Sequence, residues 1–163
     1  IRQSIFSLGA TSRPTSLRGR VAEVVGTTVG FAVPPATTFA GPVEHVTQES
    51  LAQDVAAVVR ESLANAVRHG RAGTAHVHVA VREGWLVVEV ADDGIGAVDL
   101  TPRAERSGLS NMAERARRRG GSMTAEVVPR DDGSAGGARL EAGASDDPQA
   151  VAGGVVVRWS VPL

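Results

Sequence analysis

Three short polar segments in the middle of the chain constrain its fold and its chemistry more than any other feature. They read Glu61-Ser-Leu-Ala-Asn65-Ala-Val-Arg68-His69, Asp92-Asp93-Gly94-Ile95-Gly96 and Ser107-Gly108-Leu109-Ser110-Asn111-Met112. The first has helical spacing that places an acid, an amide and a base on one side. The second is a glycine turn behind an acidic residue, and the third has a glycine that opens another helix. Together they indicate one site built from three pieces.

Composition bounds the class of protein. A chain of 163 residues predicts one domain with a core that needs no covalent cross-links. Cysteine is absent, so neither a disulfide framework nor a thiolate metal site is available. A net charge of -1 argues against general affinity for nucleic acid or anionic membranes. No apolar run is long enough to span a bilayer and no signal peptide opens the chain, so we expect a cytoplasmic domain without membrane contact.

Hydrophobic periodicity and turn residues predict the order of helices and strands. We expect helices over Leu17–Val25, from Gln48 or Ser50 to Gly70, and over Gly108–Arg119, and strands over Thr27–Val33, His76–Arg82, Trp85–Ala91, Met123–Val128 and Val155–Val161. Ser50 and Gln53 could form a capping box, and Pro34-Pro35 should end the first strand. This order predicts an α/β fold, a two-layer α/β sandwich in which three helices cover one face of a mixed sheet.

Three further segments carry no clear periodicity or stand apart from the domain. Residues Ala97 to Ser107 contain Thr101-Pro102 and suit a mobile lid. Residues 129–154 are rich in Gly, Ala and Asp and are expected to form a flexible insertion in a hairpin. Residues 1–8 have the apolar spacing of a helix end, and the chain begins without methionine, so we expect a fragment of a longer protein.

The long helix ending at Gly70 should have two different faces. At 100° per residue, Val55, Val59 and Leu63 share one face, whereas Glu61, Asn65 and Arg68 lie on the opposite one. The apolar face is expected to pack against the sheet, which leaves the polar face for the site.

These motifs resemble the ATP-binding catalytic domain of bacterial sensor histidine kinases, the HATPase domain with a Bergerat fold. The resemblance covers roughly residues 42–163, with residues 1–41 expected to hold the end of a dimerisation helix and a linker into the first helix and strand. The patterns Glu-x-x-x-Asn-Ala-x-Arg-His and Gly-Leu-x-Asn-Met-x-Glu-Arg-Ala look like the nitrate-sensor and DesK-like branch. Both ends of the chain look most like actinobacterial oxygen- and redox-sensing dormancy kinases.

The resemblance assigns roles to the first segment. It implies that Asn65 supplies an oxygen ligand to Mg²⁺, an ion that prefers hard oxygen ligands and keeps several waters. Glu61 matches the acidic residue that orients or activates the phosphoryl acceptor. Arg68 and His69 match a basic pair near the phosphates or ribose. On their own, Glu61 and Arg68 would be read as a solvated helix face.

The other two segments would hold the base and the phosphates of ATP. A carboxylate at Asp92 can accept a hydrogen bond from the adenine amino group, which guanine lacks at that position. Gly94 and Gly96 would let the backbone lie close to the base with positive φ, although an Asp-Gly turn alone is common. Gly108, with Ser107 and Leu109 beside it, would present helix N-terminal amides to the phosphates, and Ser107 could simply cap the helix.

Other candidate sites are weaker. His76 and His78 could form a two-histidine metal clip, but surface histidines are the better interpretation because no third ligand is near. Arg115, Arg117, Arg118 and Arg119 could contact an acidic partner, although a solvated helix end is favoured. Trp85 and Trp159 are expected to pack. No Walker-type Gly-Lys-Ser/Thr motif is present, which excludes a P-loop nucleotidase.

The resemblance implies a kinase that uses ATP and Mg²⁺ to phosphorylate a histidine. His45, His69, His76 and His78 all lack the setting of a phosphoacceptor, so the acceptor is expected on a dimerisation domain outside this chain. A response regulator would be the next partner, and the full-length protein would be a homodimer. Two alternatives stay open: an anti-sigma-factor-type serine kinase, and a non-catalytic module in which nucleotide gates docking to a regulator.

Overall fold

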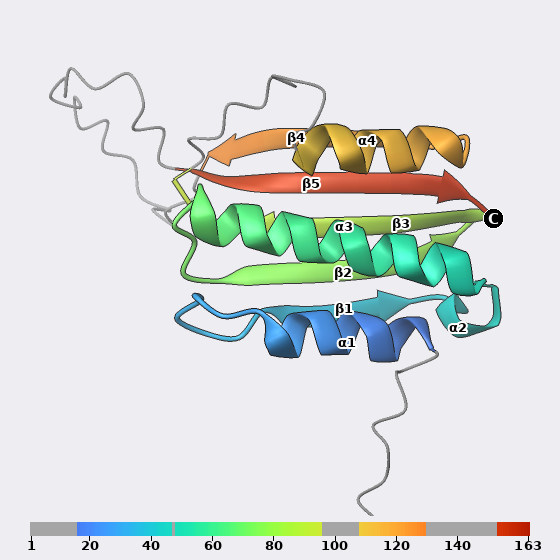
Figure 1. The fold of residues 1–163 in the computed structure, drawn as a ribbon, viewed down its shortest axis with the longest axis horizontal. Helices are drawn as coiled ribbons and strands as arrows, with labels where there is room; N and C mark the ends of the chain where they lie inside the picture. The colour runs from blue at the N-terminus through green and yellow to red at the C-terminus, as the bar shows by residue number, and fades with distance from the viewer. Residues whose placement is uncertain (1–15, 47, 96–107, 130–152) are drawn as a thin grey trace, which may run out of the picture.

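Five strands form one mixed sheet in the order β1-β2-β3-β5-β4 in a computed structural model that describes residues 16–46, 48–95, 108–129 and 153–163 (Figure 1). The strands are β1 (Ala36–Ala40), β2 (Ala75–Arg82), β3 (Trp85–Asp92), β4 (Ser122–Pro129) and β5 (Gly153–Pro162). Strand β1 runs parallel to β2, and the other three pairings are antiparallel. The antiparallel strands β2 and β3 are joined by a tight turn at Glu83-Gly84, where both residues have positive φ.

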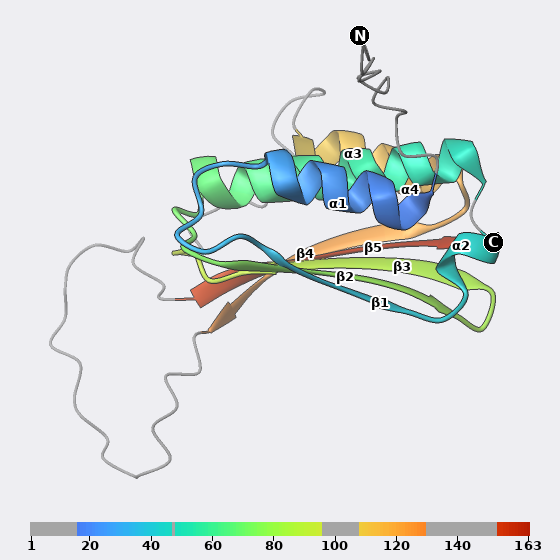
Figure 2. The same ribbon diagram turned by 90° about the horizontal axis from the view of Figure 1, so that it is seen from below.

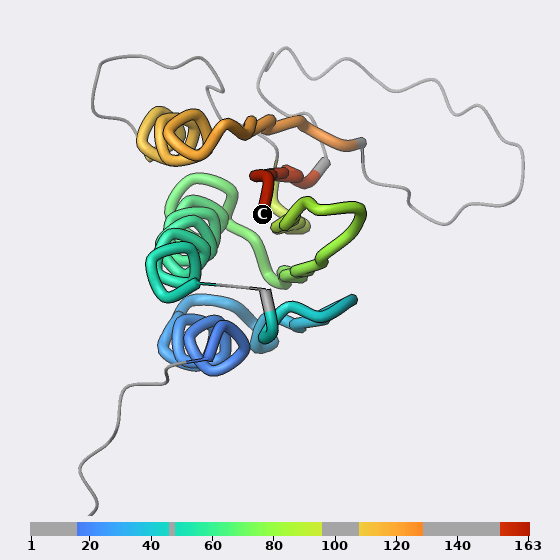
Figure 3. The backbone as a smooth tube through the Cα atoms, turned by 90° about the vertical axis from the view of Figure 1, so that its right-hand side faces the viewer, coloured from blue at the N-terminus to red at the C-terminus, as the bar shows by residue number. Residues whose placement is uncertain are grey.

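In the described part of the chain, helices cover only one face of this sheet. They are α1 (Leu17–Thr27), the short α2 (Val43–Val46), α3 (Glu49–Arg68) and α4 (Gly108–Arg118). Figure 2 shows α1, α3 and α4 in one layer above the strands, and Figure 3 shows the same two layers end-on. The predicted two-layer α/β sandwich with a mixed sheet is therefore confirmed.

The core lies between the two layers. Alternate residues of β2 and β3 point toward the helices because successive strand side chains face opposite sides of the sheet. Val77, Val79, Leu86 and Val88 are buried there. The α3 residues predicted to face inward, among them Leu63, are buried against them. The helix therefore leaves the opposite side of its C-terminal half available for a site.

The first strand was predicted in the wrong place. Residues 27–33 do not form a strand: Thr27 ends α1, and the Thr28 hydroxyl donates to the Val24 carbonyl 2.7 Å away, so β-branched residues close a helix here. Strand β1 instead follows Pro34-Pro35 and occupies an edge of the sheet, where prolines that cannot donate hydrogen bonds are tolerated.

Helix α3 starts within one residue of the predicted position, but without the predicted capping box. Helix α3 begins after Gln48, and Gln53 Nε2 donates to Glu49 rather than forming a capping box with Ser50. Helix α2 was not predicted, and its Glu44 carboxylate accepts hydrogen bonds from the Leu17 and Arg18 amides at 3.2 and 2.9 Å. These bonds cap the N-terminus of α1, where backbone amides lack helical partners.

The remaining boundaries agree with the sequence within one or two residues. Strands β4 and β5 pair out to Pro129 and Gly153, so the strand ladder borders the expected insertion. The rest of that insertion, the expected lid and the expected N-terminal helix end lie outside the described residues. In the part of the chain that is described, no helix has both the length and the apolar character needed to cross a bilayer.

Candidate functional site

A small pocket lies where α3 ends, β3 ends, and α4 and β5 begin, at the same end of the sheet in Figure 1. We call it the Asp92 pocket. Its lining residues come from all four elements: Ser62, Asn65, Ala66, Gly70, Asp92, Leu109, Val155 and Val157. Valine, alanine and leucine supply an apolar lining, and Ser62, Asn65 and Asp92 add a few polar groups, as is typical of small-molecule sites. Asn65, Asp92 and Leu109, one from each polar segment, are therefore brought together.

Glu61 lies one helical turn before Asn65 and borders the start of α4. A Cβ placed on Gly108 would overlap the Glu61 carboxylate, so this carboxylate lies against the backbone of the first residue of α4. The amides at a helix N-terminus lack intrahelical acceptors and favour negative charge. Gly108 is thus needed for close approach, and an acidic group already occupies the vicinity of the helix start.

Asn65 presents an amide to the same pocket. Its residue is partly buried, and within the described part of the chain its side chain makes no hydrogen bond. An amide oxygen is a hard ligand, so this group fits a Mg²⁺ ion that would take its remaining ligands from phosphate oxygens and water. The predicted helix face is confirmed for this residue, while its role as a ligand stays a prediction.

Asp92 is the last residue of β3, and its carboxylate is held in place by backbone amides. Oδ1 accepts hydrogen bonds from Gly94 N at 2.8 Å and Val155 N at 3.5 Å. Burial raises the pKa of Asp92 above its ordinary value of 3.8, and these two amides oppose that rise. A carboxylate that is both fixed and desolvated can accept strong hydrogen bonds from a ligand.

The turn after Asp92 is built by close packing rather than by positive φ. The structure contradicts the expectation for Gly94, which is not among the residues with positive φ. A Cβ on Gly94 would instead lie 2.5 Å from the Gly70 carbonyl oxygen and 2.8 Å from Asp92 Oδ1. The next residue, Ile95, donates to the same Gly70 carbonyl at 2.8 Å. Gly94 is therefore required because two backbone segments meet there.

The neighbouring Asp93 fixes the chain that leads into β2. Its Oδ1 accepts hydrogen bonds from Gly73 N and Thr74 N, each at 2.8 Å. The Gly73 carbonyl in turn accepts from the Ala32 and Val33 amides. Asp93 thus ties the end of β3 to two other loops, which holds the adjacent Asp92 in place in the pocket wall.

Not all predicted site residues meet in the pocket. Arg68 lines a separate hollow between α3 and the end of α1, with Thr28, Val29 and Arg60. His69 is exposed and its backbone caps α3 through the Asn65 carbonyl. Gly96 and Ser107 lie outside the described residues, so their expected roles stay predictions.

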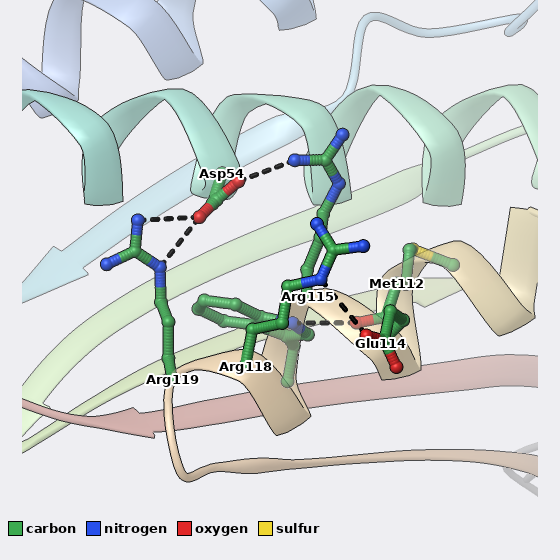
Figure 4. Close-up of polar contacts among 7 residues, drawn as sticks. Asp54, Met112, Glu114, Arg115, Arg118 and Arg119 are labelled. Atoms are coloured by element: carbon green, nitrogen blue, oxygen red, sulfur yellow. Dashed lines mark hydrogen bonds and ion pairs between the residues drawn. The ribbon is translucent and has the colours of Figure 1, made fainter.

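Helix α4 is anchored at two points, which positions Gly108 and Leu109. Trp159 Nε1 donates to the Met112 carbonyl at 3.1 Å, and both residues are fully buried. On the other side of the helix, Asp54 of α3 pairs with Arg115 and Arg119 (Figure 4). Two of the arginines expected to be solvated therefore bind α3 instead.

The other two arginines and the histidines behave as surface groups. Arg117 and Arg118 pair with Glu114 on their own helix. His76 and His78 share the hydroxyl of Thr38, at 3.2 and 2.8 Å. No group of three or more His, Cys, Asp and Glu side chains that could hold a metal occurs among the described residues.

Sequence reasoning missed several lining residues. Gly70 was taken only as a helix stop, and Val155 and Val157 only as strand residues. Ser62 was not singled out, although it is the one buried polar residue in the described part of the chain, 3% exposed. Its signal in the sequence was its place next to Glu61 on a helix that otherwise buries apolar residues.

Comparison with known proteins identifies relatives of this fold. The family model described as a histidine kinase-like ATPase domain matches residues 33–144. The sensor histidine kinase NarS of Mycobacterium tuberculosis is 36% identical over 77 residues. That match covers 45% of this chain and 18% of NarS, so the aligned segment spans less than a fifth of that relative.

Two solved structures have the same fold. The histidine kinase domain of the Escherichia coli osmosensor EnvZ is 18% identical with a TM-score of 0.54, covering 94% of this chain and 92% of that one. The ATP-binding domain of PrrB from M. tuberculosis is 16% identical with a TM-score of 0.54, covering 90% and 93%. At these identities the likeness concerns the fold.

Proposed function

The chain belongs to the family of histidine kinase-like ATPase domains, and from this premise we propose that it binds Mg-ATP in the Asp92 pocket and transfers the γ-phosphoryl group to a histidine on a dimerisation domain outside this chain. A response regulator would receive the phosphoryl group next. The single observation that carries the proposal is the convergence of Asn65, Asp92 and Leu109 on one pocket.

Asp92 would select adenine. Its carboxylate lines the pocket, and one oxygen is already fixed by the Gly94 and Val155 amides. A fixed carboxylate accepts a hydrogen bond from the amino group of adenine but would face the carbonyl oxygen of guanine, which is repulsive. The valine and alanine walls of the pocket would enclose the flat faces of the base.

Asn65 and Glu61 would act at the phosphate end. Asn65 would hold Mg²⁺, which when bound neutralises phosphate charge and orients the chain of phosphates. Glu61 would orient or activate the incoming histidine. In phosphoryl transfer the protein contributes mainly position and electrostatic stabilisation, so small displacements of these two groups should lower the rate strongly.

Gly108 and Leu109 would close the site from the α4 side. The start of α4 lies next to Glu61, and its N-terminal amides would face the phosphates once nucleotide enters. Arg68 and His69 would contact the phosphates or ribose. Arg68 would first have to adopt another side-chain conformation, because it lines the hollow beside α1. Gly94, Gly96 and Ser107 complete the proposed ATP-binding set.

We propose further that the chain is part of a cytoplasmic homodimeric sensor kinase of the nitrate-sensor and DesK-like branch. The motif Glu-x-x-x-Asn-Ala-x-Arg-His and the similarity to the sensor histidine kinase NarS support a sensor-kinase origin. The closer resemblance to actinobacterial oxygen- and redox-sensing dormancy kinases rests on the chain ends alone.

A transfer assay tests this function. Incubated alone with labelled ATP, the chain should acquire no acid-labile phosphate on its own four histidines. With the dimerisation helices of its own parent protein added as a separate polypeptide, it should phosphorylate them slowly, because no tether raises their local concentration. Stable phosphate on a serine of an added anti-sigma antagonist, with none on the helices, would favour the serine-kinase alternative. Nucleotide binding without transfer to either would favour the docking module.

A further inference from the structure

Ser62 is a buried hydroxyl in the wall of the Asp92 pocket. It lies on α3 one turn before Asn65, is 3% exposed, and shares the pocket with Asp92. Within the described residues, its only side-chain hydrogen bond is to Met112 Sδ at 3.5 Å. A thioether is a weak acceptor, so the Ser62 hydroxyl makes only a weak hydrogen bond.

Structural demands do not account for a serine at this position. Serine is a poorer helix former than alanine, and it often compensates by donating to the carbonyl four residues earlier. Ser62 makes no such bond in the described structure. A buried polar group without a strong partner costs stability, so the fold alone would favour alanine here.

From this position we propose that Ser62 is a specificity-determining residue of the pocket, whose hydroxyl donates a hydrogen bond to ring nitrogen N1 of a bound adenine beside the amino group taken by Asp92. This inference rests on the proposed function. The hydroxyl can turn from Met112 toward the pocket by rotation about its Cβ–Oγ bond, with no movement of α3. Ring nitrogen is a stronger acceptor than a thioether, so ligand entry favours that rotation.

Asp92 and Ser62 together would recognise two adjacent positions of adenine. Asp92 accepts and Ser62 donates, which complements the amino donor and the N1 acceptor of adenine. Guanine and hypoxanthine present the reverse, a carbonyl acceptor next to an N1–H donor, so both contacts would be lost and both protein groups left unpaired. A site that is built to hydrogen-bond one pattern rejects the opposite one much more strongly than an apolar pocket does.

The test combines one protein change with one ligand change. Calorimetry measures binding of Mg-ATP and of Mg-1-deaza-ATP, in which N1 is replaced by C–H, to the wild-type chain and to Ser62→Ala. We expect Ser62→Ala to weaken ATP binding about three- to tenfold, the range for one net hydrogen bond. The same variant should bind 1-deaza-ATP as tightly as the wild type. Its melting temperature without nucleotide should be unchanged or higher.

Matched variants separate this role from a structural one. Ser50→Ala, on the exposed first turn of the same helix, should change neither affinity nor melting temperature. Ser62→Cys keeps the side-chain shape, with a slightly larger sulfur atom, but donates weakly, so it should reproduce the loss for ATP and decides the matter if Ser62→Ala does not fold. Equal weakening of both nucleotides, or no weakening of either, would overturn the assignment of Ser62.

Failure of the proposed function would give a different pattern. If the wild-type chain binds neither nucleotide, the ATP site itself is refuted, and the Ser62 inference falls with it. If the wild type binds ATP and Asp92→Asn abolishes binding, but Ser62→Ala does not discriminate the two nucleotides, only the Ser62 inference falls.

Discussion

Replacing Trp159 by phenylalanine should destabilise the domain by about 2 kcal/mol, the sum of a lost hydrogen bond and an unfilled space. Trp159 is 0% exposed, and its Nε1 donates to the Met112 carbonyl at 3.1 Å. Loss of that hydrogen bond costs about 1 kcal/mol. The smaller ring leaves about 40 Å³ unfilled, which at about 24 cal/mol per Å³ adds a further ~1 kcal/mol.

Urea unfolding followed by circular dichroism measures this loss. The urea midpoint should fall with an unchanged slope, and the melting temperature should drop by roughly 5 °C. Trp85→Phe is the matched control: Trp85 is 42% exposed, so its replacement should cost less than about 0.5 kcal/mol. Equal losses in the two variants would refute the view that Trp159 anchors α4.

Three further changes test other parts of the account. Asp92→Asn should make the nucleotide-free chain at least as stable as wild type at pH 7, because burial penalises the ionised Asp92 and raises its pKa. The wild type should gain stability relative to this variant as pH falls through the raised pKa toward 3.8, and urea midpoints with the opposite pH slope would contradict the assignment. Asp54→Asn should lower the unfolding free energy by about 1 kcal/mol, and by less in about 1 M salt, because it removes the ion pairs with Arg115 and Arg119. Glu114→Gln, the control, should lower it by under about 0.5 kcal/mol, and a salt-independent loss in the Asp54→Asn melting curves would argue against an electrostatic contact. Gly94→Ala should lower the unfolding free energy measured in urea by about 1–3 kcal/mol, because the added Cβ would meet the Gly70 backbone. Gly84→Ala, which has open space around it but positive φ, should lower it by about 1 kcal/mol, and no loss at Gly94 would show that the turn adapts freely.

Long periodic elements were predictable because their pattern repeats several times. Helix α3 and the hairpin of β2 and β3 carry such patterns, and their bounds agree with the sequence within two residues. Helix α2 has only four residues, too few for a helical period to be visible. Strand β1 was misplaced because the β-branched residues of 27–29 resemble a strand, while the hydroxyls of Thr27 and Thr28 donate to helix carbonyls and close α1, which propensity does not show.

The site was predictable where a motif fixes a residue at an element's end. Asn65 and Asp92 share a pocket because helix periodicity and the end of β3 determine their positions. Ser62, Gly70 and Val155 were not predictable, since they become neighbours of Asp92 only through tertiary contacts. Val155 is placed there by the pairing of β5 with β3, and Gly70 by backbone contacts with the turn after Asp92. The direction of Arg68 depends on the loop after α1, which sequence reasoning had assigned to a strand.

Calorimetric titration with Mg-ATP and Mg-GTP measures whether the Asp92 pocket binds adenine nucleotide and rejects guanine nucleotide. We expect the wild-type chain to bind Mg-ATP and not Mg-GTP. Asn65→Ala should strongly weaken binding with an unchanged circular dichroism spectrum, and Asp92→Asn should abolish it. The amide introduced by Asp92→Asn would turn its NH₂ toward the adenine amino group and would lack the charge that strengthens the hydrogen bond. Equal affinity for the two nucleotides, or full affinity for Mg-ATP in both variants, would contradict the assignment of the Asp92 pocket as an ATP site.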